Sequence, residues 1–196
     1  MIGSRLEGEG NGRVLLVTSS LPGEGKSLLC LALARALAFS GRRTLLIDVD
    51  PWRPSVGRLA KRLTMELTED KVAGLEVALD QASGLSVAIP GEGTAGTQQA
   101  AHVRNVTASL EGLRAAYDVI LLDAPPVLAV PDVLPAAAAA DATILVVRFE
   151  GPGSAAVTNA IDKLEGVGAK LAGTVLSRVS ARLYRRYGYG PVLYSR

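Results

Sequence analysis

The chain has 196 residues, a formal net charge of +2, 48% hydrophobic residues and 20% charged residues. This length is typical of one globular domain with a sizeable core, and the small net charge argues against a nucleic-acid-binding protein. A single cysteine, Cys30, excludes an internal disulfide and fits a reducing compartment. No signal peptide is recognisable and no apolar run reaches the roughly 18 residues of a membrane helix, so we expect a soluble, cytoplasmic domain.

Along the chain, short apolar runs alternate with longer helical patterns. Residues 1–12 are polar and glycine-rich, which indicates a flexible leader. We expect buried strands at Arg13–Ser19, Thr44–Asp48, Leu85–Pro90, Val119–Asp123, Ala142–Arg148 and Leu171–Leu176. We expect helices at Lys26–Ser40, Thr97–Tyr117, Ala136–Ala140 and Ser154–Gly166, with Cys30 in the core. Prolines and glycines punctuate Trp52–Thr97, which predicts short helices and a mobile loop there.

Continuous apolar strands that alternate with helices predict an α/β fold. We expect a doubly wound, mostly parallel sheet with helices on both faces, formed by residues 13–180. Residues 181–196 contain Gly188, Gly190 and Pro191 and are expected to form a flexible tail.

The segment VTSSLPGEGKSLL joins the first predicted strand to the first helix, where a phosphate-binding loop has to lie. Two glycines free the backbone to turn its N–H groups toward an anion, and a lysine and a serine follow them. The nucleotide-contacting residues are expected to be Pro22, Gly23, Glu24, Gly25, Lys26, Ser27 and Leu28. Lys26 would contact the β- and γ-phosphates and the Ser27 hydroxyl would bind magnesium. The sequence therefore predicts that the chain binds ATP with Mg²⁺.

Three aspartates follow the ends of predicted strands: Asp48 and Asp50 in LLIDVD, and Asp123 in VILLD. The carboxyl ends of parallel strands meet at one edge of the sheet, so all three carboxylates are expected to face the phosphate loop. Oxygen ligands suit magnesium, and Asp123 is the natural metal ligand together with Ser27. Asp48 and Asp50 are candidates for binding the metal, orienting Lys26 or accepting a proton.

Four of the five tyrosines fall in the last thirteen residues: Tyr184, Tyr187, Tyr189 and Tyr194. Their hydroxyls would be phosphate acceptors if the tail can reach an active site. A stacking platform, a basic tail that touches a membrane and a strand that packs on a partner remain alternatives. Two other side chains are also left open. Trp52 either covers the nucleotide or packs locally, and Arg148 either reaches a phosphate or caps its strand. His102 has no histidine or cysteine partners and is not expected to bind a metal.

The succession SSLPGEGKS, LLIDVD with RP, YDVILLDAPPVLAVPD, ATILVVR and a YGYG tail resembles the bacterial tyrosine kinases of exopolysaccharide and capsule assembly. The resemblance runs from Arg13 to the C-terminus and implies a P-loop fold related to the MinD/ParA group. It implies that Lys26 and Ser27 hold phosphates and magnesium, that Asp48 and Asp50 form a second Walker-like motif, and that Asp123 is the Walker B carboxylate.

The resemblance also implies autophosphorylation of the tail tyrosines between subunits of a ring or dimer, which tunes polymer length and export. The implied partner is a membrane-embedded polysaccharide co-polymerase or activator, with no nucleic acid. The domain would then lie at the inner face of the plasma membrane, through that partner or through a missing membrane segment.

Several positions depart from the pattern of the family that the chain resembles. Leu28 stands where the family usually has threonine, Trp52 where it has arginine, although Arg53 follows, and Ser177 where it has asparagine. The middle segment lacks an asparagine-proline pattern, and the leader lacks a helix with spaced arginines. These departures favour one alternative to a kinase, a degenerate nucleotide-binding module that regulates the same polysaccharide machinery. A second alternative is an ATPase switch of the ParA/MinD type, because the D-x-D-P of Asp48 to Pro51 also fits that group.

Overall fold

The computed structural model describes residues 12–50, 52–91 and 99–180. The strands are β1 (Arg13–Ser19), β2 (Thr44–Asp48), β3 (Glu66–Val72), β4 (Leu75–Asp80), β5 (Leu85–Ile89), β6 (Val119–Asp123), β7 (Ala142–Arg148) and β8 (Leu171–Ser177). The helices are α1 (Lys26–Phe39), α2 (Ser55–Arg62), α3 (Gln99–Ala116), a 3₁₀ turn η2 (Pro131–Val133), α4 (Leu134–Ala139) and α5 (Ser154–Gly166). No helix among the described residues is long and apolar enough to cross a bilayer.

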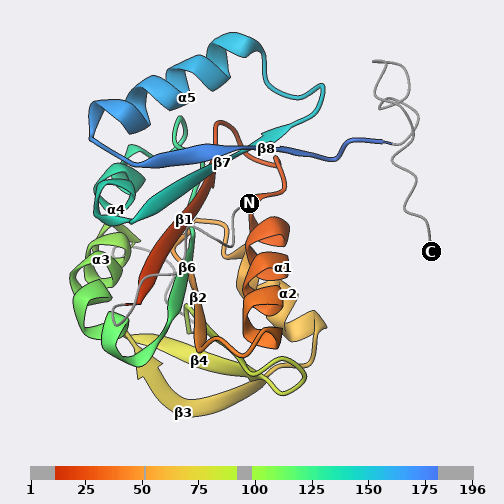
Figure 1. The fold of residues 1–196 in the computed structure, drawn as a ribbon, viewed down its shortest axis with the longest axis vertical. Coiled ribbons are helices and arrows are strands. Elements are labelled where there is room, and N and C mark those ends of the chain that lie inside the picture. Colours follow the sequence, from red (N-terminus) through yellow and green to blue (C-terminus); the bar gives the residue numbers. More distant parts are fainter. Residues whose placement is uncertain (1–11, 51, 92–98, 181–196) are drawn as a thin grey trace.

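One sheet of eight strands, in the order β3-β4-β5-β2-β6-β1-β7-β8, runs through the molecule (Figure 1). The strands from β5 to β8 in this order are parallel, and β4 pairs antiparallel with both β5 and β3. Helices α1 and α2 cover one face, and α3, α4 and α5 cover the other. This confirms the predicted doubly wound, mostly parallel sheet.

Alternation of side chains along the central strands builds two cores. In β1, Val14 and Leu16 pack toward the face of α3 to α5, whereas Leu15 and Val17 pack toward α1 and α2. Both cores are apolar because a parallel strand covered on both faces has no side that contacts water. Cys30 lies in the α1 core with no exposed surface, as predicted.

The segment after α2 corrects one expectation. Short helices are expected between Trp52 and Thr97, and α2 is one of them, but β3 and β4 form a hairpin there instead of further helices. Val72 pairs with Leu75, so Ala73 and Gly74 make a two-residue turn, with φ of 52° and 83°. Positive φ at both central residues is the geometry that suits the twist of a hairpin. Residues 92–98 of the segment expected to contain a mobile loop lie outside the described residues, as do the predicted leader up to residue 11 and the tail 181–196.

An internal anchor fixes the start of the central strands against α3. Arg114 donates from Nη1 to Asp141 Oδ2 and to the Gly12 carbonyl, each at 2.6 Å. Asp141 Oδ2 also accepts the Val14 N–H at 2.7 Å. These bonds hold β1, β7 and α3 in register at the end of the sheet opposite the phosphate loop.

The sheet topology determines where a ligand can lie. From β1 the chain moves to β2 on one side of β1, and after β6 it crosses to β7 on the other side of β1. The strand order therefore reverses beside β1. In such sheets the crevice at the carboxyl ends of the strands binds ligands. Asp48 of β2 is paired directly with Asp123 of β6 at that edge.

Candidate nucleotide-binding site

The loop Ser20–Ser27 leaves β1 and turns into α1 as the sequence predicts. Gly23 and Gly25 have φ of 81° and 89°, a left-handed backbone conformation that residues other than glycine rarely adopt. Gly25 is the residue that caps α1, and a Cβ there would lie 3.4 Å from Ser177 Oγ. The loop therefore needs glycine at Gly25 for its backbone turn, whereas a Cβ there would make only ordinary van der Waals contact with Ser177 of β8.

Glu24 fastens this loop to neighbouring strands from inside the protein. Its carboxylate accepts the Leu21 N–H at 2.7 Å and the Arg148 N–H at 3.0 Å, and its own carbonyl accepts the Ser177 hydroxyl at 2.5 Å. The side chain is 2% exposed. The sequence predicts Glu24 only as a loop residue beside the nucleotide. The structure shows that it joins the loop to the ends of β7 and β8.

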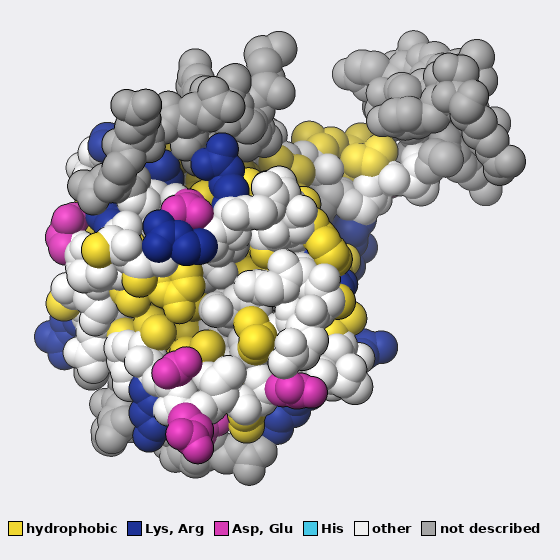
Figure 2. Space-filling model, turned by 60° about the horizontal axis from the view of Figure 1, so that its bottom comes forward, with side chains coloured by type: hydrophobic (Ala, Val, Ile, Leu, Met, Phe, Trp, Pro, Cys, Tyr) yellow, Lys and Arg dark blue, Asp and Glu magenta, His cyan; other side chains and the backbone are white. Residues whose placement is uncertain are grey.

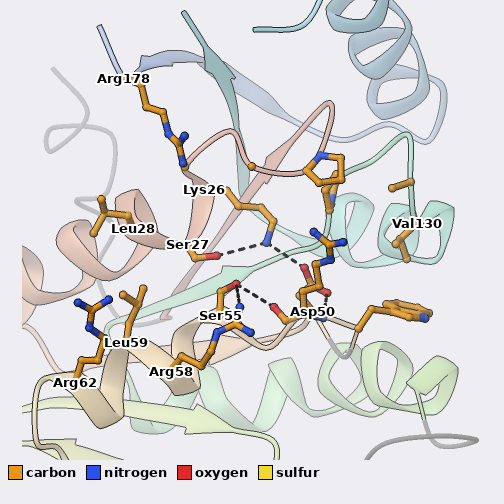
Figure 3. A pocket seen from close by; sticks show the side chains of 17 residues that line it. Lys26, Ser27, Leu28, Asp50, Ser55, Arg58, Leu59, Arg62, Val130 and Arg178 are labelled. Carbon is orange, nitrogen blue, oxygen red and sulfur yellow. Dashed lines mark hydrogen bonds and ion pairs between the residues drawn. The ribbon is translucent and has the colours of Figure 1, made fainter. Parts of the chain in front are cut away.

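Lys26 lies among carboxylates at the start of α1. Its Nζ is 3.2 Å from Asp50 Oδ2, 3.7 Å from Asp123 Oδ1 and 3.5 Å from the Ser27 hydroxyl (Figure 3). Burial lowers the pKa of Lys26, but the nearby carboxylates of Asp123 and Asp50 outweigh it and raise the pKa. Lys26 is thus a fixed positive charge at the mouth of the phosphate loop.

Asp123 is a buried carboxylate that faces Lys26. It has no exposed surface, and neither of its oxygens finds a hydrogen-bond donor among the described residues. Burial raises the pKa of Asp123 to about 6, against the opposing effect of Lys26. Lys26, 3.7 Å away, compensates part of the charge of Asp123, and the two carboxylate oxygens without donors fit a further cation that the folded protein binds there.

Asp48 is turned toward the backbone. Its two oxygens accept the Asp50 N–H at 3.1 Å and the Val56 N–H at 3.0 Å. Burial, followed by the neighbouring charge of Asp123, raises the pKa of Asp48 to about 8. Of the three aspartates expected to face the phosphate loop, Asp50 and Asp123 pair with Lys26, whereas Asp48 holds the start of α2. The catalytic and metal-binding roles expected for Asp48 stay predictions.

A cavity of about 650 Å³ opens in front of the loop. The phosphate loop, Asp50, α2, the segment after β6 and Arg178 form its wall, and Trp52 lines it with 43% of its surface exposed. Leu28 lines it too and is 65% exposed. Trp52 is therefore placed beside the ligand space, one of the two positions considered for it.

Other predicted residues have different surroundings. Arg148 meets the loop through its backbone N–H, and its side chain does not line the cavity. The His102 ring bonds the Asp48 carbonyl at 2.9 Å, which ties α3 to the end of β2. Tyr184, Tyr187, Tyr189 and Tyr194 lie outside the described residues. Motif reasoning did not single out Arg58, Arg62 and Arg178 of the cavity, because none of them belongs to the loop or to a strand-end carboxylate pattern.

The donor set fits a nucleotide with magnesium. Glycine-rich turns, Lys26 and the start of α1 suit phosphates, and Ser27 and Asp123 offer oxygen ligands. No cluster of three or more His, Cys, Asp or Glu side chains within the described ranges is arranged to hold a metal by itself.

The model of the CobQ/CobB/MinD/ParA nucleotide binding domain matches residues 15–187. The chain is 32% identical to the tyrosine-protein kinase CpsD of Streptococcus agalactiae, over 91% of this chain and 82% of that protein. It is 30% identical to the putative tyrosine-protein kinase EpsB of Ralstonia nicotianae, over 94% of this chain and 25% of EpsB, so it spans about a quarter of that relative's length. The solved kinase domain of VpsO superposes with a TM-score of 0.72 at 29% identity, and the match covers 86% of each chain.

Proposed function

Because the chain belongs to the CobQ/CobB/MinD/ParA nucleotide-binding family and, within it, to the bacterial tyrosine kinases, we propose that it transfers phosphate from ATP to tyrosines of its own C-terminal cluster. The observation that carries this proposal is the arrangement at the phosphate loop: a buried Lys26 between Asp50 and Asp123, with both Asp123 oxygens lacking donors.

Each residue at the loop has a proposed role. Lys26 and the backbone N–H groups of the loop bind the β- and γ-phosphates, while Ser27 and Asp123 hold magnesium, Asp123 directly or through water. When bound, magnesium supplies positive charge that offsets the charge on the terminal phosphate. Most of the catalytic effect of these groups comes from positioning and electrostatics.

The proton acceptor is proposed to be Asp50. Asp50 lines the cavity, whereas Asp48 does not and has both oxygens engaged by backbone N–H groups. In the transfer, a tyrosine oxygen forms a bond to the γ-phosphorus, the bond from that phosphorus to the bridging oxygen breaks, and Asp50 takes the phenolic proton. Asp48 acts by holding the Asp50 backbone and the start of α2 in place.

The proposed acceptors are Tyr184, Tyr187, Tyr189 and Tyr194, reached between copies of the chain in a ring or dimer. The putative tyrosine-protein kinase in the cps region of Klebsiella pneumoniae is 24% identical over 92% of this chain, and the succinoglycan biosynthesis transport protein ExoP of Rhizobium meliloti is 28% identical over 89% of it. We propose the same setting here: regulation of exopolysaccharide or capsule polymerisation and export, at the inner face of the membrane, with a membrane-embedded polysaccharide co-polymerase or activator as partner.

The test is phosphate mapping on the full chain. Phosphatase-treated protein is incubated with ATP and Mg²⁺, and phosphotyrosine is located by mass spectrometry. Phosphate is expected on the tail tyrosines of the wild type and on none of them in Lys26→Met. Tyr117, which packs partly buried against the core at the end of α3, is an internal control and should stay unmodified.

Other outcomes separate this proposal from its rivals. ATP turnover without tail phosphate, repeated with the cytosolic segment of a candidate membrane activator, would overturn the kinase and favour a ParA/MinD-type switch. Nucleotide binding without turnover would favour a degenerate module. The observation that supports this second candidate is Leu28, whose exposed apolar side chain lines the cavity where the family's threonine would offer a hydroxyl.

A further inference from the structure

The wall of the cavity opposite the phosphate loop is cationic. Arg58 and Arg62 lie one turn apart on α2 and both line the cavity, as does Arg53 just before the helix. Figure 3 shows Arg58 and Arg62 on the α2 side, across Lys26 and Ser27 from Arg178. We call Arg53, Arg58 and Arg62 the α2 wall.

The cavity holds more positive charge than a nucleotide uses. Its lining includes four arginines, whereas Lys26 is already paired with Asp50 and Asp123. Magnesium-bound ATP carries about two negative charges, fewer than four arginines would balance. The face in Figure 2 has basic and acidic side chains interspersed. The surplus charge of the cavity therefore calls for a second anion beside the nucleotide.

The α2 wall has few partners within the protein. The guanidinium of Arg58 donates to the Ser55 hydroxyl at 3.2 Å, and the Arg53 and Arg62 side chains form no ion pair with other described residues. The sequence of α2, SVGRLAKR, contains no acidic residue. Like charges spaced i,i+4, such as Arg58 and Arg62, destabilise a helix. The helix dipole favours a cation in the last turn, where Arg62 lies, but it does not account for Arg58 or Arg53.

We propose that the α2 wall binds a phosphotyrosine of the C-terminal cluster, delivered by a second copy of this chain. This rests on the proposed function and deepens it. Residues 181–196 contain four arginines and no acidic residue, so the unmodified tail is repelled by the wall. One phosphotyrosine brings about −1.5 to −2 charges and three strong acceptor oxygens that guanidinium groups match well.

Trp52 completes the site because it lines the same cavity with its ring partly exposed. An aromatic surface beside arginines suits both halves of a phosphotyrosine, its ring and its phosphate. A tail phosphorylated once is then retained beside the phosphate loop, where a neighbouring tyrosine of the same cluster can be modified next.

Synthetic peptides test this without any kinase activity. The phosphatase-treated full chain is saturated with ADP and Mg²⁺, so that the phosphate loop is filled and no γ-phosphate is available. Peptides spanning 181–196, unmodified or phosphorylated at Tyr187 and Tyr189, are titrated by calorimetry and by the fluorescence of Trp52, the chain's single tryptophan. The phosphopeptide is expected to bind about tenfold or more tightly than the unmodified peptide.

The double variant Arg58→Gln/Arg62→Gln should lose this preference. The matched control Arg42→Gln/Arg104→Gln removes the same charge outside the cavity and should keep it. Equal binding of the two peptides, or equal losses in the variant and its control, overturns the proposal. So does Arg58- and Arg62-dependent binding of phosphatidylglycerol vesicles in place of the phosphopeptide. Because the phosphates are synthetic, a failure here is separate from a failure of the kinase, which the phosphate mapping detects.

Discussion

Replacing Asp123 by asparagine should make the nucleotide-free protein more stable at neutral pH. Burial raises the pKa of this carboxylate in the folded protein to about 6, from its ordinary value of 3.8. The folded state therefore binds protons more readily than the unfolded chain. The stability associated with Asp123 is present in full below the unfolded pKa and is lost as the pH rises through about 6. The asparagine side chain does not ionise, so the Asp123→Asn variant escapes this loss.

The magnitude follows from the shift of about two pKa units. At 1.36 kcal/mol per unit, ionised Asp123 lowers the free energy of unfolding by about 3 kcal/mol at pH 7.5. The buried amide that replaces it has poor hydrogen-bond partners, which costs about 1–2 kcal/mol. The net gain is about 1–2 kcal/mol, or roughly 2–8 °C in melting temperature for a domain of this size.

Thermal unfolding with EDTA and without nucleotide measures the effect. The gain should appear at about pH 7.5, and the contribution from ionisation should shrink to about half near pH 5. Asp118→Asn is the control, because Arg43 bonds this exposed carboxylate and lowers its pKa, so no gain is expected. Adding ADP and Mg²⁺ should stabilise the wild type more than Asp123→Asn. A variant no more stable than the wild type at neutral pH, or a gain independent of pH, would refute the reasoning.

Three further predictions concern stability and pH. Since burial also raises the pKa of Asp48, to about 8, the nucleotide-free protein should lose unfolding free energy as the pH rises from about 5.5 to 8.5; urea titrations that show the opposite slope would contradict this. Glu24→Ala leaves the Leu21 and Arg148 N–H groups without their acceptor, so it should lower the free energy of urea unfolding by about 1–3 kcal/mol and weaken nucleotide binding. Glu24→Gln should have smaller effects, and equal effects of the two variants would argue against the role of these hydrogen bonds. Arg114→Met breaks the bonds to Asp141 and the Gly12 carbonyl and should lower stability by about 2–3 kcal/mol, whereas a neutral result would mean that the anchor is dispensable.

Most of the fold could be predicted because its central strands are continuous apolar runs. The β3–β4 hairpin could not, since β3 is an edge strand whose sequence ELTEDKV is nearly all polar and mostly exposed. An edge strand that buries few side chains shows no alternation of hydrophobic and polar residues in its sequence. The available signal was Ala73–Gly74, a two-residue turn followed by the alternating Leu75, Glu76 and Val77.

The part of the site that belongs to recognisable sequence motifs was predictable. Strand-end spacing placed Lys26, Asp50 and Asp123 together, and the structure confirms that they meet. Spacing cannot show which way a carboxylate turns, so the engagement of Asp48 by backbone N–H groups was not foreseen. The arginines of α2 reach the cavity only because the helix packs beside α1, a tertiary relation with no local pattern.

The hydrogen bond from Ser177 to the Glu24 carbonyl fixes where the chain leaves the sheet. Tyr184 follows Ser177 by seven residues, a tether of at most about 25 Å when fully extended. Tyr184, a proposed acceptor, is therefore tethered close to the rim of the chain's own phosphate loop. The tether sets the local concentration of Tyr184 at any protein concentration, so the proposed transfer between copies competes with a tyrosine of the same chain even in dilute solution.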